Sequence, residues 1–384
     1  MEQVYLDNAA TSYPKAPGVG ENMKYFIENI GCNINRGIYI NAQTAVEIVL
    51  ETRELLSRLF NFSNPENVIF TMNITQSLNF LIKGLLKRQD HCIVSSMEHN
   101  AVMRPLLQLE KKGVEFTRVP CDNKGRLNSD DLYKEIRANT KAVIINHASN
   151  VCGTILPIDE IGRICRENGI IFIVDTAQTA GIQDIDFEKS YIDALAFTGH
   201  KGLLGPQGIG GFIITDSLAE KLEPLVSGGT GSLSDSEEVP SFLPDRFEPG
   251  TQNLPGIFGL NAALLYLEKE GIDSIRDREI ELTGMFLKEI GNMEGIEIIG
   301  IQGLEGRTAV VSIDCKNRDN AEISYELDKN YGIMTRCGLH CAPSAHKTLG
   351  TFPKGTVRFS FSHFNNEKEV NYTIDSIMKI LKQK

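Results

Sequence analysis

Residues 194–201 read Ala-Leu-Ala-Phe-Thr-Gly-His-Lys, a short apolar run that leads directly into a lysine in a glycine-flanked turn. The run is too short for a helix and has no polar face, which is typical of a strand buried on both sides. The same pattern occurs upstream, where the apolar run Ile170–Val174 ends at Asp175. Because ligands bind beyond the carboxyl ends of strands in open α/β sheets, these two stretches predict both a fold class and the place of its site.

Apolar runs of similar length alternate with helical patterns through the first two thirds of the chain. Apolar residues recur at helical spacing from Ala45 to Leu59 and from Ile158 to Cys165, which indicates amphipathic helices. Strands that are apolar on both faces and alternate with helices predict an α/β fold with a large, mostly parallel β-sheet covered by helices. The other predicted strands are Val68–Thr71, Cys92–Ser95, Val114–Val119, Ala142–Asn146 and Gly211–Ile214.

The pattern changes at about Leu254, beyond a predicted surface loop between Gly228 and Glu238. Longer helical stretches and fewer strands follow, which indicates a smaller α+β domain. We predict a large domain over residues 16–253 and a small domain made of residues 1–15 and 254–384. The predicted small-domain strands are Arg307–Ile313, Gly332–Thr335 and Val357–Phe361, and the predicted helices are Ile257–Leu267, Ile275–Ile290, Ala321–Asn330 and Glu367–Leu381.

Composition and charge narrow the class of protein. The 384 residues carry a formal net charge of −11, which disfavours a nucleic-acid-binding surface. The longest apolar runs fall far short of the ~20 residues that a membrane-spanning helix needs, and the first residues show no export signal. Eight irregularly spaced cysteines favour free thiols over a disulfide framework. We therefore expect a cytoplasmic protein that binds neither membrane nor nucleic acid and that can carry a reactive thiolate.

Lys201 and Asp175 suit a cofactor that has an aldehyde and a basic ring. A lysine whose pKa is lowered by burial or nearby charge can form a Schiff base, and a buried carboxylate needs a cationic partner such as a pyridinium nitrogen. Each residue also has an ordinary interpretation, since most lysines are solvated and an aspartate here is often a helix N-cap. These two residues alone leave both interpretations open.

Short motifs follow one another in a fixed order along the chain. They are Tyr5-Leu6-Asp7-Asn8-Ala9-Ala10-Thr11, Asn35-Arg36-Gly37, Glu98-His99, Ser149-Asn150, Asp175-Thr176-Ala177-Gln178, Thr198-Gly199-His200-Lys201, Arg246-Phe247-Glu248-Pro249-Gly250-Thr251 and Arg336-Cys337-Gly338-Leu339-His340-Cys341. With these motifs the chain resembles the fold-type I pyridoxal phosphate enzymes, and within them the class V aminotransferase group that contains the cysteine desulfurases. The resemblance spans about Val4 to Val370 and implies a homodimer with pyridoxal 5'-phosphate as cofactor.

The resemblance implies how the cofactor ring is held. Lys201 would form the Schiff base and move protons, Asp175 would pair with the ring nitrogen, and Gln178 would hydrogen-bond the ring hydroxyl. His99 would stack on the ring and act as an acid or base, although a histidine at a helix N-terminus is otherwise an ordinary surface residue. Asn150 would contact the ring hydroxyl and the substrate carboxylate.

The resemblance also implies which residues bind the cofactor's phosphate. Thr75 would offer its amide and hydroxyl at the start of a helix, where backbone N–H groups favour anions. Thr198 and His200 would add side-chain donors, and Thr251 would reach the partner's phosphate site across a dimer. Ile74 departs from the pattern, because the family commonly has a second hydroxyl residue there.

Cys341 narrows the reaction, because this group of enzymes also includes transaminases, lyases and epimerases. It resembles the catalytic cysteine of desulfurases that have a short, ordered loop, whereas a free cysteine is otherwise most often a small buried hydrophobe. The implied reaction converts L-cysteine to L-alanine and leaves a persulfide on Cys341, with His340 or Arg336 favouring the thiolate. The implied substrate-binding residues are Arg358, whose guanidinium suits a carboxylate, Asn150, Arg336 and Asn8.

Other interpretations require different features. A selenocysteine lyase or a cysteine sulfinate desulfinase would keep the fold, and the sequence does not separate them from a cysteine desulfurase. A dehydrogenase is suggested by the glycines of 205–211, but these precede a strand, whereas a dinucleotide fingerprint follows one. A metal site of Cys337, Cys341 and His346 would lack a second cysteine pair, so we expect none.

The sequence leaves the destination of the sulfur open. A scaffold that passes sulfur without catalysis would not need Lys201 and Asp175, both of which are present. We expect a protein sulfur acceptor or scaffold as partner. Iron–sulfur cluster assembly, thiolation of RNA and selenium metabolism all remain candidate destinations.

Overall fold

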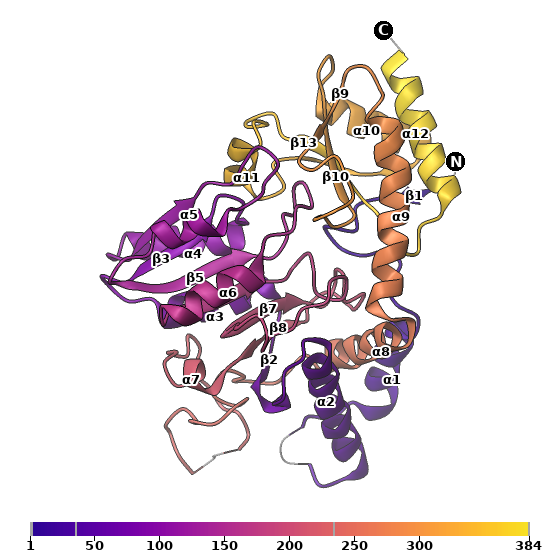
Figure 1. The fold of residues 1–384 in the computed structure, drawn as a ribbon. Helices are drawn as coiled ribbons and strands as arrows, with labels where there is room; N and C mark the ends of the chain where they lie inside the picture. The colour runs from indigo at the N-terminus through magenta and orange to yellow at the C-terminus, as the bar shows by residue number, and fades with distance from the viewer. Residues whose placement is uncertain (1–2, 35–36, 233–234, 383–384) are drawn as a thin grey trace.

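The predicted apolar strands pair into one seven-stranded sheet in the order β2-β8-β7-β6-β5-β3-β4 (Figure 1). Strand β8 is antiparallel to both of its neighbours, and the other strands are parallel to one another. The strands are β2 (Val68–Thr71), β3 (His91–Ser95), β4 (Glu115–Val119), β5 (Thr140–Asn146), β6 (Ile171–Asp175), β7 (Ala194–Thr198) and β8 (Gly210–Ile214).

This computed structural model describes residues 3–34, 37–232 and 235–382. Asn35 and Arg36, which form one of the motifs with Gly37, therefore lie outside the described residues, as does part of the predicted loop between Gly228 and Glu238.

Successive residues of the strands, apart from the edge strand β4, enter two different hydrophobic clusters, one on each face of the sheet. In β6, Phe172 and Val174 belong to one cluster and Ile171 and Ile173 to the other. Helices cover both faces, so the predicted α/β class with a mostly parallel sheet is confirmed. The first cluster includes residues of α1 (Val19–Tyr25), the π-helix η1 (Phe26–Ile30), α2 (Ile40–Leu59), α5 (Ser129–Lys134), α6 (Ile158–Glu167) and α8 (Leu254–Glu270), and the second includes residues of α3 (Ile74–Leu85), α4 (Asn100–Glu110) and α7 (Asp216–Ala219).

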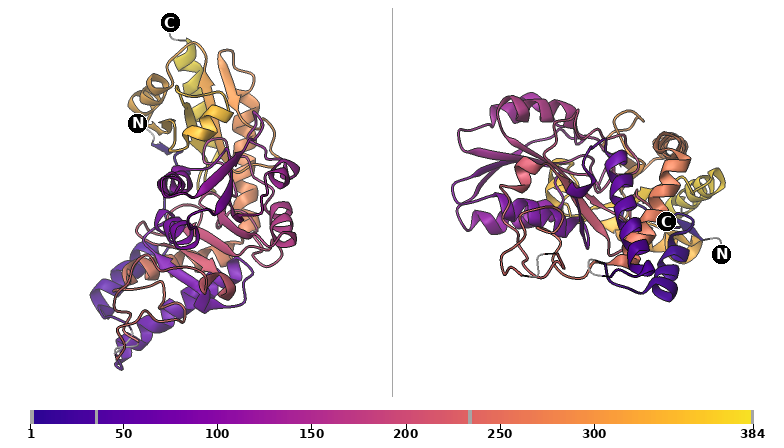
Figure 2. Two further views of the ribbon diagram at one scale, coloured as in Figure 1. Left: turned by 90° about the vertical axis from the view of Figure 1, so that its left-hand side faces the viewer. Right: turned by 90° about the horizontal axis from the view of Figure 1, so that it is seen from below.

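A second, antiparallel sheet has the order β12-β13-β10-β9 and lies with its helices at one end of the molecule, where both chain ends also lie (Figure 2). Beside it, β1 (Val4–Tyr5) pairs in parallel with β11 (Ile333–Met334). These strands and helices share a third hydrophobic cluster. Its elements are β9 (Ile296–Ile299), β10 (Val310–Cys315), β13 (Thr356–Ser360), α9 (Ile272–Ile290), α10 (Asn320–Tyr331) and α12 (Glu367–Lys382), with β12 (Arg336–Gly338) at the sheet edge.

Two details differ from the sequence interpretation. The apolar residues of α8 join the first cluster, beside α1 and α2, although we assigned residues 254–270 to the small domain; the division at residue 253 stays a proposal. Strand β10 begins at Val310 instead of Arg307. The buried guanidinium of Arg307 donates to main-chain carbonyl oxygens, including those of Ile301 and Val310, and the chain turns around it.

A small fourth cluster joins the two sheets. It buries Met97, Val151 and Cys152, which follow strands of the large sheet, against residues on the side of the second sheet. These are Ile299, Ala342, Ala345 and Leu349. The last three lie in or beside α11 (Pro343–Thr348), directly after Cys341. The Cys341 loop is therefore held against the large sheet by apolar packing.

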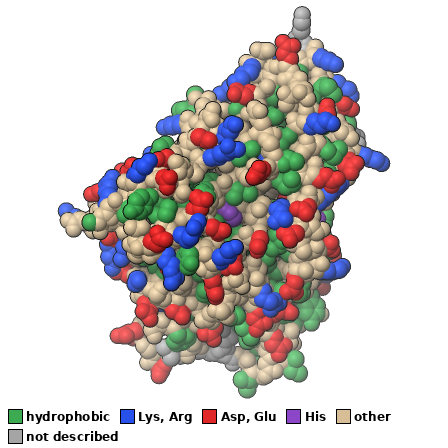
Figure 3. Space-filling model, in the orientation of Figure 1, with side chains coloured by type: hydrophobic (Ala, Val, Ile, Leu, Met, Phe, Trp, Pro, Cys, Tyr) green, Lys and Arg blue, Asp and Glu red, His purple; other side chains and the backbone are tan. Residues whose placement is uncertain are grey.

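The surface carries both signs of charge. Figure 3 shows Lys and Arg side chains interspersed with Asp and Glu over the face in view, without a continuous basic band on that face. Among the described residues, no helix combines the length and apolar character needed to cross a membrane.

Candidate active site

The ends of β6 and β7 bring Asp175 and Lys201 to the same edge of the sheet. Asp175 is the last residue of β6 and pairs with Ala196 of β7, whereas Lys201 follows β7 after a tight turn. Burial lowers the pKa of Lys201 to about 8, and the carboxylate of Asp175 acts in the opposite direction. Burial also raises the pKa of Asp175, opposed by the Ala177 amide and by Lys201. The amine and the carboxylate therefore lie within electrostatic reach of each other.

His99 caps the N-terminus of α4 with its ring in a fixed orientation. Its Nδ1 accepts a hydrogen bond from the Ala101 amide at 3.0 Å, which leaves the proton of the neutral ring on Nε2. Burial, followed by the positive charge of Lys201, lowers the pKa of His99 to about 4. The ring is therefore neutral at physiological pH and presents Nε2–H as a donor.

Buried polar atoms without partners lie next to Lys201. Within the described residues, Thr198 Oγ1 and His200 Nδ1 have no hydrogen-bond partner. Because buried polar atoms in folded proteins are normally paired, the two atoms mark a place for a polar group of a ligand. Burial also lowers the pKa of His200 to about 4, so its ring is neutral as well.

The N-terminus of α3 approaches the same strand ends. Gly210 pairs with Thr198, and a Cβ at Gly210 would lie 3.0 Å from Asn73 Cα, so a side chain there would push the helix away. The helix begins at Ile74, one residue earlier than predicted, which places the exposed Thr75 in its first turn. First-turn amides have no intrahelical acceptor and favour an anion.

Asp7 joins the two arginines that we predicted at the substrate. Arg336 donates to Asp7 Oδ2 through Nε at 3.0 Å and Nη2 at 2.8 Å, and Arg358 Nη2 donates to Asp7 Oδ1 at 3.0 Å. Arg358 is only 2% exposed. Its Nη1 donates to the main-chain oxygen of Asn150 at 2.9 Å, and its Nε has no partner among the described residues. A buried guanidinium with one free N–H is thus available for an anion.

The Cys341 thiol is exposed, but its backbone is fixed from two sides. The Asn100 amide donates to Cys341 O at 2.8 Å, and Asn150 Nδ2 donates to His340 O at 2.7 Å. His340 and Cys341 both adopt left-handed backbone conformations, with φ of 47° and 57°. Two consecutive non-glycine residues in that region cost about 1–2 kcal/mol each, so the hydrogen bonds and the fourth cluster must hold them there.

Of the two groups that we predicted to favour the thiolate, Arg336 is the charged one. His340 is buried, and burial together with Arg358 lowers its pKa to about 2, which leaves a neutral ring. Asp7 raises the pKa of Arg336, and Cys341 contributes in the same direction. Arg336 also contributes to the lowered pKa of Lys201. Its guanidinium is thus within electrostatic reach of both the thiol and the amine.

Asn8 and Gln178 make hydrogen bonds to the main chain. Asn8 Nδ2 donates to Ser360 O at 2.8 Å, and Gln178 Nε2 donates to Ala9 O at 3.0 Å. Together with Lys201 and Phe361, they line a narrow cavity between the two sheets. In the structure both amides form hydrogen bonds that hold the N-terminal segment in place. Their contacts with the substrate and the ring stay predictions.

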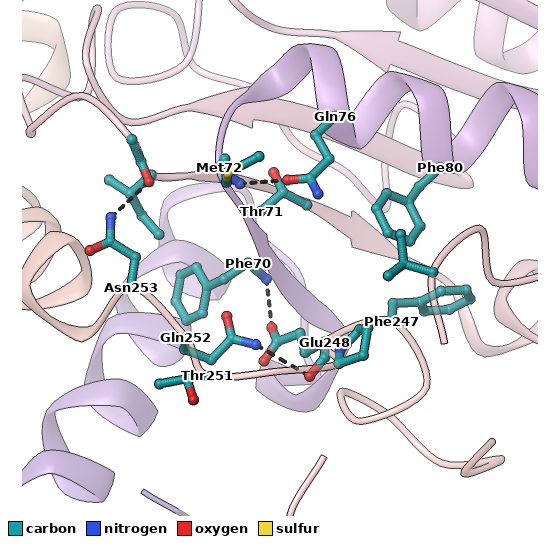
Figure 4. A pocket seen from close by; sticks show the side chains of 14 residues that line it. Phe70, Thr71, Met72, Gln76, Phe80, Phe247, Glu248, Thr251, Gln252 and Asn253 are labelled. Atoms are coloured by element: carbon teal, nitrogen blue, oxygen red, sulfur yellow. Dashed lines mark hydrogen bonds between the residues drawn. The ribbon is translucent and has the colours of Figure 1, made fainter. Parts of the chain in front are cut away.

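Thr251 lies away from these residues, at the edge of a cavity between the start of α3 and the segment 247–253 (Figure 4). It is exposed, and its hydroxyl has no hydrogen bond within the described part of the chain. The predicted function of Thr251 in a second subunit's site therefore needs a dimer.

Comparison with known proteins decides the family. The family model described as "Aminotransferase class-V" matches residues 4–373. The chain is 33% identical to a probable cysteine desulfurase of Methanothermobacter thermautotrophicus over 99% of the chain and 95% of that protein, and 34% identical to one of Pyrococcus abyssi over 100% and 95%. An apo structure of a cysteine desulfurase from Thermococcus onnurineus has a TM-score of 0.93 at 32% identity, covering 99% of this chain and 95% of the other. The chain belongs to the class V aminotransferase family, among its cysteine desulfurases.

Enzymes of this family depend on pyridoxal phosphate, and the chain has a donor set that fits it. The lowered pKa of Lys201 suits an aldehyde, and the buried carboxylate of Asp175 suits a protonated ring nitrogen. The unpartnered atoms of Thr198 and His200, beside the α3 N-terminus, suit a phosphate.

We expect incorporation of pyridoxal phosphate into cofactor-free protein to accelerate with pH up to about 8 and then level off. Only the neutral amine forms a Schiff base, and burial lowers the pKa of Lys201 to about 8. Each pH unit below that value lowers the fraction of neutral amine roughly tenfold. For an ordinary lysine this fraction, and with it the rate, would keep rising up to about pH 10. The growth of visible absorbance measures this rate. A rate still rising steeply above about pH 9 would contradict the lowered pKa.

Three buried acids in the quoted motifs, Asp7, Glu98 and Glu248, received no role from the sequence. Asp7 precedes Asn8 in its motif and accepts hydrogen bonds from both arginines that we assigned to the substrate, Arg336 and Arg358. Glu98 precedes His99, and burial raises its pKa to about 8 while Ser95 and the Asn146 amide donate to it. Among the described residues, no group of three His, Cys, Asp or Glu side chains could hold a metal ion.

Proposed function

We propose that the protein converts L-cysteine to L-alanine and takes the sulfur on Cys341 as a persulfide. The observation that carries this proposal is the exposed thiol of Cys341 on a loop fixed to the segments of His99 and Asn150. A transaminase needs no thiol at this place. The reaction balances without an oxidant, because L-cysteine and one thiol give L-alanine and one persulfide.

The residues of the large sheet prepare the substrate. Bound pyridoxal phosphate supplies an aldehyde that holds an amine and a ring that withdraws electrons. Asp175 would hold the protonated ring nitrogen, and Lys201, with its pKa near 8, would take up and return a proton at Nζ. The Nε2–H of His99 is the second proton donor of the site. The free Nε–H of Arg358 binds the substrate carboxylate, and the free Oδ1 of Asn150 accepts from the ring hydroxyl.

Cys341 then acts on the sulfur of the substrate. Its thiolate forms an S–S bond while the bond from Cβ to sulfur breaks, and Cβ takes up a proton to become the methyl group of alanine. Arg336 is the cation within electrostatic reach of the thiol. Holding the loop in one conformation keeps the thiol aimed at the substrate.

We further propose a homodimer in which Thr251 contacts the partner's phosphate site. Thr251 borders a surface hollow that also includes Tyr39 and Gly229. Large apolar side chains are exposed along the adjoining segments, among them Ile38, Tyr39, Ile40, Met72 and Val226, and exposed apolar patches of this kind mark interfaces. The persulfide on the exposed Cys341 would pass to a protein acceptor. Light scattering on the purified protein tests the dimer.

The test of the proposed reaction uses purified yellow protein, L-cysteine and a reductant. We expect alanine and sulfide in equal amounts, because the reductant releases the outer sulfur of the persulfide on every turnover. Alanine is quantified by amino-acid analysis and sulfide by a colorimetric assay. Colourless protein that forms no alanine would reject the proposal.

A further inference from the structure

A buried ion pair lies under the segment that carries Thr251. We propose that Arg53 of α2 and Glu248 position this segment, and that the pair thereby sets how tightly the cofactor's phosphate is held. Both are positioning residues, since neither touches the site itself. The inference rests on the proposed contact of Thr251 across the dimer.

The pair is largely buried, and its two side chains bond each other directly. Arg53 and Glu248 make two parallel hydrogen bonds of 3.0 and 2.7 Å, and their side chains are only 8% and 6% exposed. The guanidinium also lies over the Phe70 ring, 4.6 Å from its centre. Two bonds of fixed direction between largely buried groups define one position for the carboxylate.

The same two side chains cover the free edge of the large sheet. Strand β2 is one of the two edge strands, and its other side pairs with β8. Arg53 donates to the main-chain oxygen of Val68, and the Phe70 amide donates to Glu248 at 2.6 Å. The C=O of one residue and the N–H two residues later point to the same side of a strand. Arg53 and Glu248 thus bond the main-chain groups of β2 that a neighbouring strand would otherwise bond.

Thr251 is held between this anchor and a second one. Gln252 Nε2 donates back to Glu248 O at 3.3 Å (Figure 4). On the other side, Asn253 Nδ2 donates to Gly208 O at 2.8 Å, and its Oδ1 accepts from the Gly256 amide at 3.1 Å to cap α8. The exposed Thr251 therefore has little freedom, and its place is fixed by residues that are themselves buried or bonded.

The test replaces both charges together, because removing one partner would leave an unpaired buried charge. In Arg53→Met/Glu248→Gln, the new amide oxygen can still accept from Phe70. Holoenzyme of this variant is expected to release pyridoxal phosphate about tenfold faster on dilution, the effect of weakening one hydrogen bond to an anionic oxygen. Protein loaded with pyridoxal, which lacks the phosphate, should release it at the wild-type rate. Loss of visible absorbance measures both rates.

The matched control is Arg58→Met/Glu268→Gln, which changes a pair that also starts on α2 but is 55% exposed at both ends. It should release both compounds at the wild-type rate. Thr251→Ala should reproduce the faster release of pyridoxal phosphate, and its combination with Arg53→Met/Glu248→Gln should add nothing further.

Several results would overturn the inference. Faster release of both compounds would mean general loosening, and an unchanged release of pyridoxal phosphate would mean that the pair does not act on the phosphate. If Thr251→Ala itself has no effect, the contact across the dimer is wrong and the inference falls with it. Alanine formation from cysteine is measured separately. A negative result for Thr251→Ala would therefore not contradict the proposed reaction.

Discussion

Cys341→Ala protein is expected to remain yellow but to form alanine from L-cysteine at least about 10³-fold more slowly than the wild type. The substitution removes the nucleophile that accepts the sulfur, while Lys201 and the phosphate donors stay in place. The left-handed backbone at Cys341 is adopted as readily by alanine as by cysteine. Alanine and sulfide are quantified at saturating cysteine, and the visible spectrum reports the bound cofactor.

Cys337 provides the matched control, because its thiol is also exposed and lies four residues earlier. Side chains alternate along a strand, and Arg336 points toward Asp7, so Cys337 in β12 points away from the site. Cys337→Ala should therefore keep activity within about twofold, as surface changes usually do. Undiminished turnover of Cys341→Ala, with loss in Cys337→Ala, would transfer the nucleophile's function to Cys337.

The same Cys341→Ala protein separates cysteine from selenocysteine, two of the three substrates that the sequence left open. Cleavage of selenocysteine can proceed without the active-site thiol, so a selenocysteine lyase would retain that activity in the variant. A cysteine desulfurase would lose its activity toward cysteine. Assaying both amino acids with the same preparation gives the comparison directly.

The strands and the ends that form the site could be predicted because local patterns determine them. Apolar runs such as 171–174 and 194–197 are buried on both faces, and a polar residue placed directly after them must lie at the sheet edge. Helix α3 begins one residue before its predicted start because Asn73 caps it, and the N-cap preference for Asn over Ile could have identified this start.

Contacts between distant segments could not be predicted in the same way. Arg53 and Glu248 are 195 residues apart, and nothing near either residue indicates the other. Asp7 follows β1, and the pairing of β1 with β11 places it beside Arg336 and Arg358. Strand β10 begins after Arg307 because the guanidinium of Arg307 is buried, and nothing in the sequence beside Arg307 indicates that burial.

Lys201→Ala protein is expected to lose the visible absorbance of the bound cofactor and to form alanine at least about 10³-fold more slowly. The variant lacks both the amine that binds the aldehyde and the group that moves the proton. Lys201→Arg keeps a positive charge near the buried Asp175 and guards against loss of folding, yet a guanidinium forms no Schiff base at neutral pH. Absorbance after incubation with pyridoxal phosphate and cysteine turnover are the two measurements.

Lys15 is the informative control for this prediction. Burial lowers its pKa to about 8, as for Lys201, but its Nζ is occupied by hydrogen bonds to Thr11, Ser12 and His200 O. Lys15→Met should therefore stay yellow. If instead Lys201→Arg remained yellow and Lys15→Met became colourless, the aldehyde would be bound by Lys15 and not by Lys201. The site beside Asp175 and the unpartnered hydroxyl of Thr198 would then lack the lysine that binds the aldehyde.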